Sequence, residues 1–496
     1  MPKLQTLVRL LLGWALVSST CSAAPGDLDA TFGSGTGKVI TQHSTGNEYA
    51  YAIALQPDKK MVVGGYCYNG SDYDFCLARY LPNGALDTSF NSTGKVLTPI
   101  GPDDESVSAV AVQLDGKIVA AGYCSNGRNN DFCLARFLPN GALDTTFNTT
   151  GKVITAIGPG NDTAFALALQ PDGKIIVAGY CSNGSNNDFC LVRYLANGTL
   201  DTNFNSTGTV LTSVGTADGF VIALALQPDG KIVAAGRCSN NMNYDFCLVR
   251  YLSTGQLDAS FNTTGKVVKS IGPGNSYVSA LALQADGKIV VTGFCSNGTS
   301  FNFCLARYLP SGQLDTSFNA IGTTVTPVGA WGDTATAVAL QPDGKIIVVG
   351  FCDNSDGHFD FCLARYLGEG ILDMGFNANG KVITPIGSSD DYARAVALQA
   401  DGRIVVAGGC SNGADTDFCL VRYEGGPFDA RNCSLDIDGD NQVLATTDML
   451  IGTRIALGMS GPSVLSGIAF ASYATRTTWP AIRDYLVSQC GMSIVP

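Results

Sequence analysis

Apolar residues alternate with small or polar residues in short segments along most of the chain. One unit, read from residue 164, is AFALALQ-PDGK-IIVAGYC-SNGSNND-FCLVRYL-ANGTLDTNFNSTG-TVLTSVG, and it contains four β-type segments. Asp172-Gly173 predicts a hairpin turn between the first two segments, because both residues tolerate positive φ. Asn197-Gly198 begins the longer connection between the third and fourth segments. The pattern therefore predicts an all-β protein.

The unit recurs every 57 residues, with one step of 58. The chain order is one fourth segment beginning at residue 38, six complete units, and three final segments ending at Tyr423. The sum is 28 strands in seven four-stranded sheets, provided the first strand completes the last sheet. A ring closes its edges in this way, whereas an open β-solenoid, the alternative, needs no such match. We therefore predict a seven-bladed β-propeller over 28–430, closed by the N-terminal strand.

Two recurring runs resemble a known repeat family. LQPDGKIIVAG and DFCLARYLPNGALDTSFNSTGKV are similar to the delta-60 repeat of bacterial exported proteins, and the resemblance covers 28–423. It implies a propeller-type repeat. It implies no particular activity, because the family is defined by its repeat and not by a reaction. The cysteine pair in each unit is an addition to that family pattern.

Cysteine usage indicates a disulfide framework. Of the 17 cysteines, Cys21 lies in the N-terminal leader, which leaves an even number. Facing strand residues are about 4.5–5.5 Å apart at Cα, which suits disulfides, while two thiolates per blade fall short of the four ligands of a structural zinc. The predicted pairs are Cys67–Cys76, Cys124–Cys133, Cys181–Cys190, Cys238–Cys247, Cys295–Cys304, Cys352–Cys362 and Cys410–Cys419, and Cys433 and Cys490 bracket the C-terminal segment.

An arginine and an aspartate recur once per unit. We expect each arginine to pair with a turn aspartate or to cap carbonyl groups inside its own blade, and a sevenfold ligand ring is the alternative. The arginines are Arg79, Arg136, Arg193, Arg250, Arg307, Arg365 and Arg422, and the aspartates are Asp29, Asp87, Asp144, Asp201, Asp258, Asp315 and Asp373.

One face of the ring is predicted to be lined with carboxylates. The first segment should be innermost, and acids precede it at Glu48, Glu105, Asp162, Asp333 and Asp391. A second set precedes the Phe-Cys pair at Asp74, Asp131, Asp188, Asp245, Asp360 and Asp417. Turn hydrogen bonds are the favoured interpretation of these acids. The alternative is a ligand-binding ring, with Ca²⁺ as the natural cation for oxygen ligands.

Composition limits the kinds of partner and of catalytic chemistry that the sequence supports. The net charge of −12 argues against a nucleic-acid partner. His43 and His358 are the only histidines, so histidine-based chemistry is not indicated, and we expect both at the surface. Arg237, Trp331, His358, Arg394 and the run 103–105 break the repeat and are better candidates for a unique site. No catalytic residue is nominated.

The N-terminus has the features of a secretory signal. Lys3 and Arg9 precede an apolar run, and small residues follow, which predicts a signal peptide over 1–23. A lipid-anchored Cys21 is the alternative. No other apolar run is long enough to span a bilayer. We expect an exported protein, secreted, periplasmic or at the cell surface.

The segment 431–496 resembles a dockerin-type module with an EF-hand-like calcium loop. Acids at alternate positions after Cys433 begin such a loop, and the expected Ca²⁺ ligands are Asp436, Asp438, Asp440, the carbonyl of Gln442, and Asp448. The pattern departs at Thr447, which stands where an acid is usual, and no second loop follows. Helices are expected near 447–457 and 479–487.

These features favour a non-enzymatic exported binding or scaffold protein with an acidic ligand-binding face and a calcium-binding tail. A glycan-active hydrolase or lyase using carboxylates in the funnel is one alternative. An envelope structural or adhesion protein is the other. The expected partner is a protein or a glycan, and we expect a monomer.

Overall fold

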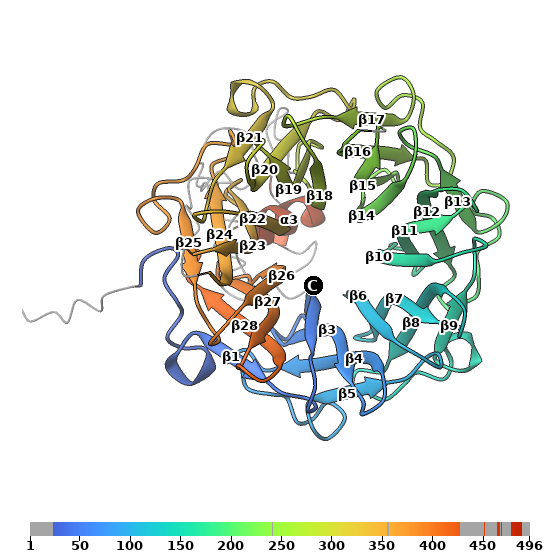
Figure 1. Cartoon of the computed structure of the whole chain (residues 1–496), viewed down its shortest axis with the longest axis horizontal. Coiled ribbons are helices and arrows are strands. Elements are labelled where there is room, and N and C mark those ends of the chain that lie inside the picture. The colour runs from blue at the N-terminus through green and yellow to red at the C-terminus, as the bar shows by residue number, and fades with distance from the viewer. Residues whose placement is uncertain are drawn as a thin grey trace, which may run out of the picture.

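The computed structural model describes residues 23–240, 242–354, 357–426, 451, 464–466, 468 and 478–488. Four strands form each of seven antiparallel sheets, which are arranged as blades in a ring (Figure 1). The predicted seven-bladed β-propeller is thus confirmed. Residues 1–22 of the predicted signal peptide lie outside the described residues, as do the predicted calcium loop, Cys433 and Cys490. The helix expected near 447–457 also lies outside them, apart from Ile451.

Blades are numbered here from β2, and the strands of blades 1 to 6 run outward from the centre of the ring in chain order. The innermost strands are β2 (Tyr49–Leu55), β6 (Glu105–Val112), β10 (Asp162–Leu169), β14 (Gly219–Leu226), β18 (Ser276–Leu283), β22 (Asp333–Leu340) and β26 (Asp391–Leu398). The second strands are β3 (Met61–Tyr68), β7 (Ile118–Ser125), β11 (Ile175–Ser182), β15 (Ile232–Ser239), β19 (Ile289–Ser296), β23 (Ile346–Asp353) and β27 (Ile404–Ser411).

The third strands are β4 (Tyr73–Tyr80), β8 (Asn130–Phe137), β12 (Asn187–Tyr194), β16 (Tyr244–Tyr251), β20 (Phe301–Tyr308), β24 (Phe359–Tyr366) and β28 (Thr416–Tyr423). The outermost are β5 (Lys95–Thr98), β9 (Lys152–Thr155), β13 (Thr209–Thr212), β17 (Lys266–Lys269), β21 (Thr323–Thr326), β25 (Lys381–Thr384) and β1 (Lys38–Thr41). Short 3₁₀ turns are η1 (Gly33–Gly35), η2 (Phe147–Thr149) and η3 (Phe318–Ala320).

The N-terminal strand closes the ring. Strand β1 pairs antiparallel with β28, with Lys38 opposite Val421, and forms the outer edge of blade 7. A buried cluster then joins blade 7 to blade 1, since Phe418 and Leu420 pack with Met61 and Val63. Equivalent apolar clusters lie between all neighbouring blades. Burial of this apolar surface is what holds each sheet against the next.

The repeated arginine links neighbouring blades on the far face, which we define as the face carrying the hairpins between first and second strands. Arg193 Nε donates to Asp201 at 2.8 Å, as predicted, and its guanidinium lies 4.5 Å from the ring centre of Phe204. Its Nη1 reaches the carbonyl of Ser253 in the next blade at 2.6 Å. The carbonyl cap therefore lies between blades and not inside one blade as expected.

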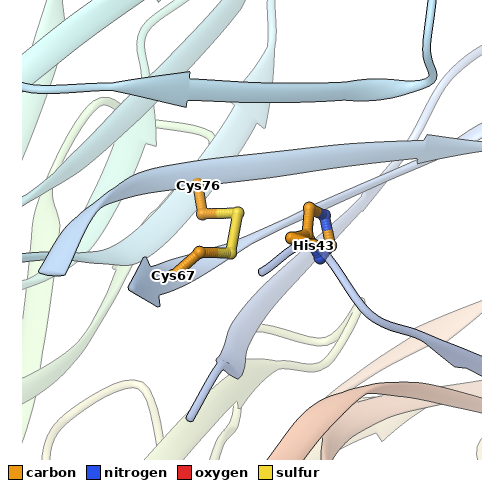
Figure 2. Close-up of side chains that lie close together, drawn as sticks. All are labelled: His43, Cys67 and Cys76. Atoms are coloured by element: carbon orange, nitrogen blue, oxygen red, sulfur yellow. A yellow bond between two sulfur atoms is a disulfide. The ribbon is translucent and has the colours of Figure 1, made fainter. Parts of the chain in front are cut away.

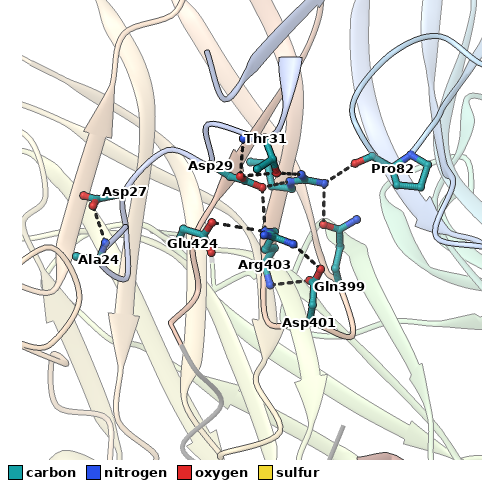
Figure 3. A network of polar contacts seen from close by, with 10 residues as sticks. Ala24, Asp27, Asp29, Thr31, Pro82, Gln399, Asp401, Arg403 and Glu424 are labelled. Atoms are coloured by element: carbon teal, nitrogen blue, oxygen red, sulfur yellow. Dashed lines mark hydrogen bonds and ion pairs between the residues drawn. The ribbon is translucent and has the colours of Figure 1, made fainter. Parts of the chain in front are cut away.

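The same contacts recur where the ring closes (Figure 3). Arg422 on β28 pairs with Asp29 at 2.6 Å and donates to the carbonyl of Pro82 in blade 1 at 2.5 Å. Arg403 adds a second cation 2.9 Å from the Asp29 carboxylate. The N-terminal segment is thereby tied to both the last blade and the first.

Helix α3 (Trp479–Ser488) agrees with the second helix predicted in the C-terminal segment. Trp479 and Ile482 are buried in the structure. Across the described residues, none of the helices has the length and apolar character required to cross a membrane.

Candidate binding site at the mouth of the central channel

A β-bulge in every innermost strand directs one side chain into the channel. The register slips once in each first strand, for example between Ala164 and Ala166. A bulged residue is left out of the ladder, so its side chain is re-aimed. All seven bulged residues, which are Tyr51, Ser108, Phe165, Ile222, Ser279, Thr336 and Arg394, line one cavity of about 770 Å³. A volume of this size accommodates a small ligand.

Aromatic side chains gather at the end of the channel where the innermost strands begin, which we call the mouth. On blades 6, 7 and 1, neighbouring ring centres lie between 4.9 and 6.3 Å apart. We call this set the first arc, and it comprises Phe351, Phe359, Tyr392, Tyr49, Tyr51, Tyr66, Tyr68 and Tyr73.

A second arc lies on blades 3, 4 and 5. Its rings are joined across blades, with Tyr180 and Phe220 4.9 Å apart and Tyr244 and Tyr277 5.5 Å apart. The members are Phe165, Tyr180, Phe220, Tyr244, Tyr277, Phe294 and Phe301. The cavity is lined by Tyr51 and Phe351 of the first arc and by Phe165, Tyr180 and Phe294 of the second. Both arcs therefore face the same space.

Each arc surrounds one arginine. Arg394 lies 5.2 Å from the ring centre of Phe351 and 5.6 Å from that of Tyr392. Arg237 lies 4.8 Å from Phe220 and 5.3 Å from Tyr277. The Nε–H groups of both arginines are buried without a hydrogen-bond partner in the described chain. Neither guanidinium forms an ion pair with any described residue. Cation–π contacts hold the guanidinium groups in place while leaving donors unused.

Four of the tyrosine hydroxyls at the mouth have a raised pKa and remain protonated near neutral pH. Burial raises the pKa of Tyr51, Tyr66 and Tyr123, and it raises the pKa of Tyr392 to about 12. A phenol in this state is a hydrogen-bond donor and acceptor and not a proton-abstracting base. The arrangement thus has stacking surfaces, cationic donors and neutral hydroxyls, which suit recognition of a ligand better than acid–base chemistry.

The structure places the five acids of the predicted ligand ring in the turns that lead into the innermost strands. All five carboxylates are buried and accept backbone N–H groups of their own turns. Asp162, for example, accepts from Ile157 at 2.7 Å and from Gly158 at 2.8 Å. Burial raises the pKa of Glu105 to about 7, against the opposing effect of its hydrogen bonds from Gly101 and Ile100. Hydrogen bonds of this kind, from backbone N–H groups to a carboxylate in the same turn, are the ones expected if the acids stabilise the turns.

The second set of acids is also buried. Asp188 accepts from the side chain of Asn183 at 2.8 Å, and Asp417 accepts from Asn412 at 2.8 Å. These bonds shape the loops between second and third strands. Among the described residues that line the cavity, none is a carboxylate. The acids therefore organise the turns around the mouth, and its inner wall is aromatic and cationic.

The positions that break the repeat lie in different environments. Arg237 and Arg394 lie at the centres of the two arcs, whereas Trp331 is 73% exposed. Within the run 103–105, Asp104 accepts the backbone N–H of Tyr73 in the preceding blade at 3.2 Å. The side chain of His358 is 47% exposed, as expected, but that of His43 is only 6% exposed. The expectation of a surface position for His43 is therefore wrong.

All seven predicted hairpin disulfides are present, one in each blade, with Cα–Cα distances of 5.5 to 5.9 Å. Disulfides in this number are typical of proteins that mature in an oxidising compartment. The aromatic arcs were not predicted from the sequence. Their signal was the alignment of aromatic residues opposite one another on first and second strands, such as Tyr277 opposite Phe294.

Comparison with known families shows that the chain is a β-propeller repeat protein. Seven segments match the family described as "Domain of unknown function (DUF5122) beta-propeller", at residues 56–90, 113–147, 170–204, 227–261, 284–318, 341–376 and 399–425. Each match begins at the end of an innermost strand, and the first six continue into the connection after the third strand. A comparison with curated proteins gives no match.

The comparison with solved structures gives matches at low sequence identity. A catalytically inactive virginiamycin B lyase from Staphylococcus aureus with quinupristin is 10% identical at a TM-score of 0.46, and the match covers 77% of this chain and 98% of that one. The polysaccharide lyase Uly1 is 12% identical at a TM-score of 0.44, covering 78% and 91%. Sqt1 from Chaetomium thermophilum, bound to the N-terminus of ribosomal protein L10, is 14% identical at 0.42, covering 78% and 98%. All three TM-scores lie below 0.5, and no activity is inferred from these matches.

Proposed function

We propose that the protein is a non-enzymatic exported binding protein whose ligand occupies the mouth of the channel, between the two aromatic arcs. The observation that carries this proposal is that each arc encloses an arginine whose Nε–H has no partner among the described residues. An unused buried donor costs free energy in the absence of a ligand. A ligand acceptor that reaches it would recover that cost.

The chemistry of the wall favours an acidic carbohydrate. Aromatic rings stack on the apolar faces of sugar rings, and arginine binds carboxylate or sulfate groups through paired hydrogen bonds. Hydroxyl groups of Ser106, Ser108, Thr163 and Thr334 line the same cavity and can bond to sugar hydroxyls. No carboxylate among the described cavity residues would repel such a ligand.

A hydrolase acting through carboxylates is less well supported. That mechanism requires two carboxyl groups on either side of the scissile bond. The five acids proposed for the funnel are buried in turns, and their oxygens accept backbone N–H groups. Binding without turnover is therefore the function that the described site supports best.

The test is calorimetric titration of the full chain with three probes. Oligogalacturonate carries carboxylates, a heparin-derived oligosaccharide carries carboxylates and sulfates, and a galactan of matched length carries neither. We expect at least one acidic probe to bind about tenfold or more tightly than the neutral galactan, which corresponds to about 1.4 kcal/mol. Equal binding of all three probes, or binding of none, would contradict the proposal.

Repeat-guided variants locate the site without disturbing the fold. Arg237→Tyr and Arg394→Thr introduce residues that stand at the equivalent positions of other blades, Tyr180 and Thr336. Each should weaken binding of the acidic probe about tenfold, since a charge-assisted hydrogen bond contributes about 1.5–3 kcal/mol. Arg128→Ala, which removes an exposed loop arginine, should leave binding unchanged.

We further propose that the C-terminal loop binds Ca²⁺ through Asp436, Asp438, Asp440, Gln442 and Asp448. The support is the alternating oxygen-ligand pattern in the sequence. Calcium titration of the full chain should show one site that is lost in the double variant D436N/D438N. Calcium uptake that is unchanged in this variant would contradict the assignment.

A further inference from the structure

One blade differs from the other six beside its disulfide. Five residues before the turn acid or its equivalent, blades 2 to 7 carry an aliphatic residue: Ile100, Ile157, Val214, Ile271, Val328 and Ile386. In blade 2 this residue, Ile100, packs against the apolar cluster that contains Cys124 and Cys133. Blade 1 has His43 at this position. An imidazole therefore stands where the repeat otherwise covers its disulfide with an aliphatic side chain.

His43 lies directly beside the Cys67–Cys76 disulfide (Figure 2). A ring nitrogen of His43 and the two sulfur atoms all lie within 4.8 Å of one another. The two cysteines are fully buried, on facing strands with a Cα–Cα distance of 5.6 Å. Two sulfurs bound at about 2.3 Å to a tetrahedral ion lie about 3.8 Å apart, so opening the disulfide would require only a small displacement to bind a metal.

The imidazole of His43 is held by its neighbours through one nitrogen only. Its Nδ1 lies 3.0 Å from Glu48 Oε2, and its Nε2 is buried with no partner in the described structure. The ring also packs on Phe418, with 4.6 Å between ring centres. Metal-binding histidines commonly have one nitrogen held by a carboxylate while the other binds the ion. Glu48 and Phe418 thus fix the imidazole and leave Nε2 for a ligand.

We propose that the reduced form of blade 1 is a zinc site, with Cys67 Sγ, Cys76 Sγ and His43 Nε2 as ligands. In the reduction, two molecules of a thiol reductant supply two electrons and two protons and become a disulfide, while the Cys67–Cys76 bond breaks to give two thiols. Zinc then binds the two thiolates and the imidazole, and the two thiol protons leave to solvent. A Cys₂His set with one open position is an established zinc coordination.

Zinc binding and the disulfide exclude each other, so the bridge becomes sensitive to zinc. Zinc binds only the reduced form and must pull the thiol–disulfide equilibrium towards reduction. At a free zinc concentration ten times the dissociation constant, the ratio of reduced to oxidised bridge rises about tenfold. The other six hairpins have two sulfurs but no histidine at the equivalent position.

The test uses the folded full chain in glutathione buffers of graded ratio, with and without zinc. Peptide-resolved alkylation measures how far each bridge is reduced while the others remain closed. We expect zinc to increase reduction of Cys67–Cys76 about tenfold and to leave Cys124–Cys133 unchanged. An equal response of both bridges would indicate non-specific thiol binding, and no response at Cys67–Cys76 would equally overturn the proposal.

Exchange of the distinguishing residue provides the matched controls. His43→Ile restores the repeat residue and should abolish the zinc response of blade 1. Ile100→His places an imidazole beside the blade 2 bridge, where Glu105 can hold it, and should create a zinc response there. Cobalt(II) bound to the partly reduced wild type should show thiolate-to-metal charge-transfer absorption that H43I lacks. Retention of the zinc response in H43I would refute the ligand assignment.

Discussion

The two faces of the ring use the same strands for opposite purposes. On the far face, seven nearly identical sets of arginine, aspartate and phenylalanine join each blade to the next. At the mouth, equivalent positions carry different side chains, so that Tyr123, Arg237 and Gly409 share one place in the repeat. Repetition on one face maintains the ring, whereas divergence on the other varies the side chains around the cavity.

The bulges show how the two purposes coexist. Every innermost strand has the same backbone irregularity, yet the side chain that it directs inward is tyrosine, serine, phenylalanine, isoleucine, threonine or arginine. A repeated backbone can therefore present a non-repeated wall. The two faces should respond differently to pH and to substitution, which makes the comparison testable.

Acid should weaken the far face first. Burial alone would raise the pKa of Asp87, but hydrogen bonds from Ser89 and Lys60 and the charge of Arg79 outweigh it and lower the pKa to about 2. Asp29, Asp144, Asp258 and Asp315 are shifted in the same direction. A carboxyl with a lowered folded pKa stabilises the protein above its unfolded pKa. We expect thermal stability, followed by circular dichroism, to fall steeply from about pH 4 to 2.

Glu105, a turn acid beside the mouth, should contribute to stability with the opposite dependence on pH. Burial raises the folded pKa of Glu105 to about 7, so its protonated form favours the folded state. This contribution is lost as pH rises from about 4.5 to 7. E105Q should reduce the loss of thermal stability between about pH 4.5 and 7. D87N should reduce part of the loss of thermal stability between about pH 4 and 2. Identical pH profiles for the wild type and both variants would contradict the contrast between the faces.

Substitution of a far-face arginine should be the most damaging single change. Arg193 and Asp201 are both buried, with side-chain exposures of 9% and 1%. Arg193→Leu leaves the carboxylate without its cation and should lower the free energy of unfolding by about 3–5 kcal/mol in urea titrations. R193L/D201N also removes the unpaired charge of Asp201 and should recover much of the lost free energy of unfolding. If the double variant were as unstable as the single one, the loss would lie in packing and not in charge.

Removal of one hairpin disulfide should have a smaller effect. Each closes a short loop, and the chain-entropy relation gives about 2.5 kcal/mol for a loop of about ten residues. C181A/C190A should lose about this amount in urea unfolding, and C67A/C76A in blade 1 provides a comparison at an equivalent site. A loss below about 1 kcal/mol in both would show that the blades are held by the interfaces between them.

The fold was predictable because its signals are local and repeated. Alternation marked the strands, turn pairs such as Asp172-Gly173 marked the hairpins, and the unmatched first strand indicated closure through β1 and β28. The inter-blade reach of Arg193 to the carbonyl of Ser253 was not predictable, because it spans 60 residues. Sequence spacing does not tell which carbonyl of a neighbouring sheet lies within reach.

The site was predictable only in part. Arg237 and Arg394 stood out as departures from the repeat, but their aromatic surroundings come from separate blades and become apparent only in three dimensions. The acids of the predicted ring lie in turns, and the sequence does not show that a carboxylate such as Asp162 accepts hydrogen bonds from its own backbone. The burial of His43 had a signal, since six aliphatic residues occupy its position in the other blades.

An arginine at the mouth should be nearly dispensable for stability. Arg394 contacts Tyr51, Phe351 and Tyr392 only through cation–π geometry, and its Nε–H has no partner in the described residues. Such a contact contributes about 0.5–1 kcal/mol at a partly exposed site. R394T should therefore change the free energy of unfolding by about 1 kcal/mol or less, several times less than R193L, while weakening the acidic probe about tenfold. A loss as large as that of R193L would mean that the first arc is part of the scaffold, and the division of labour between the two faces would fail.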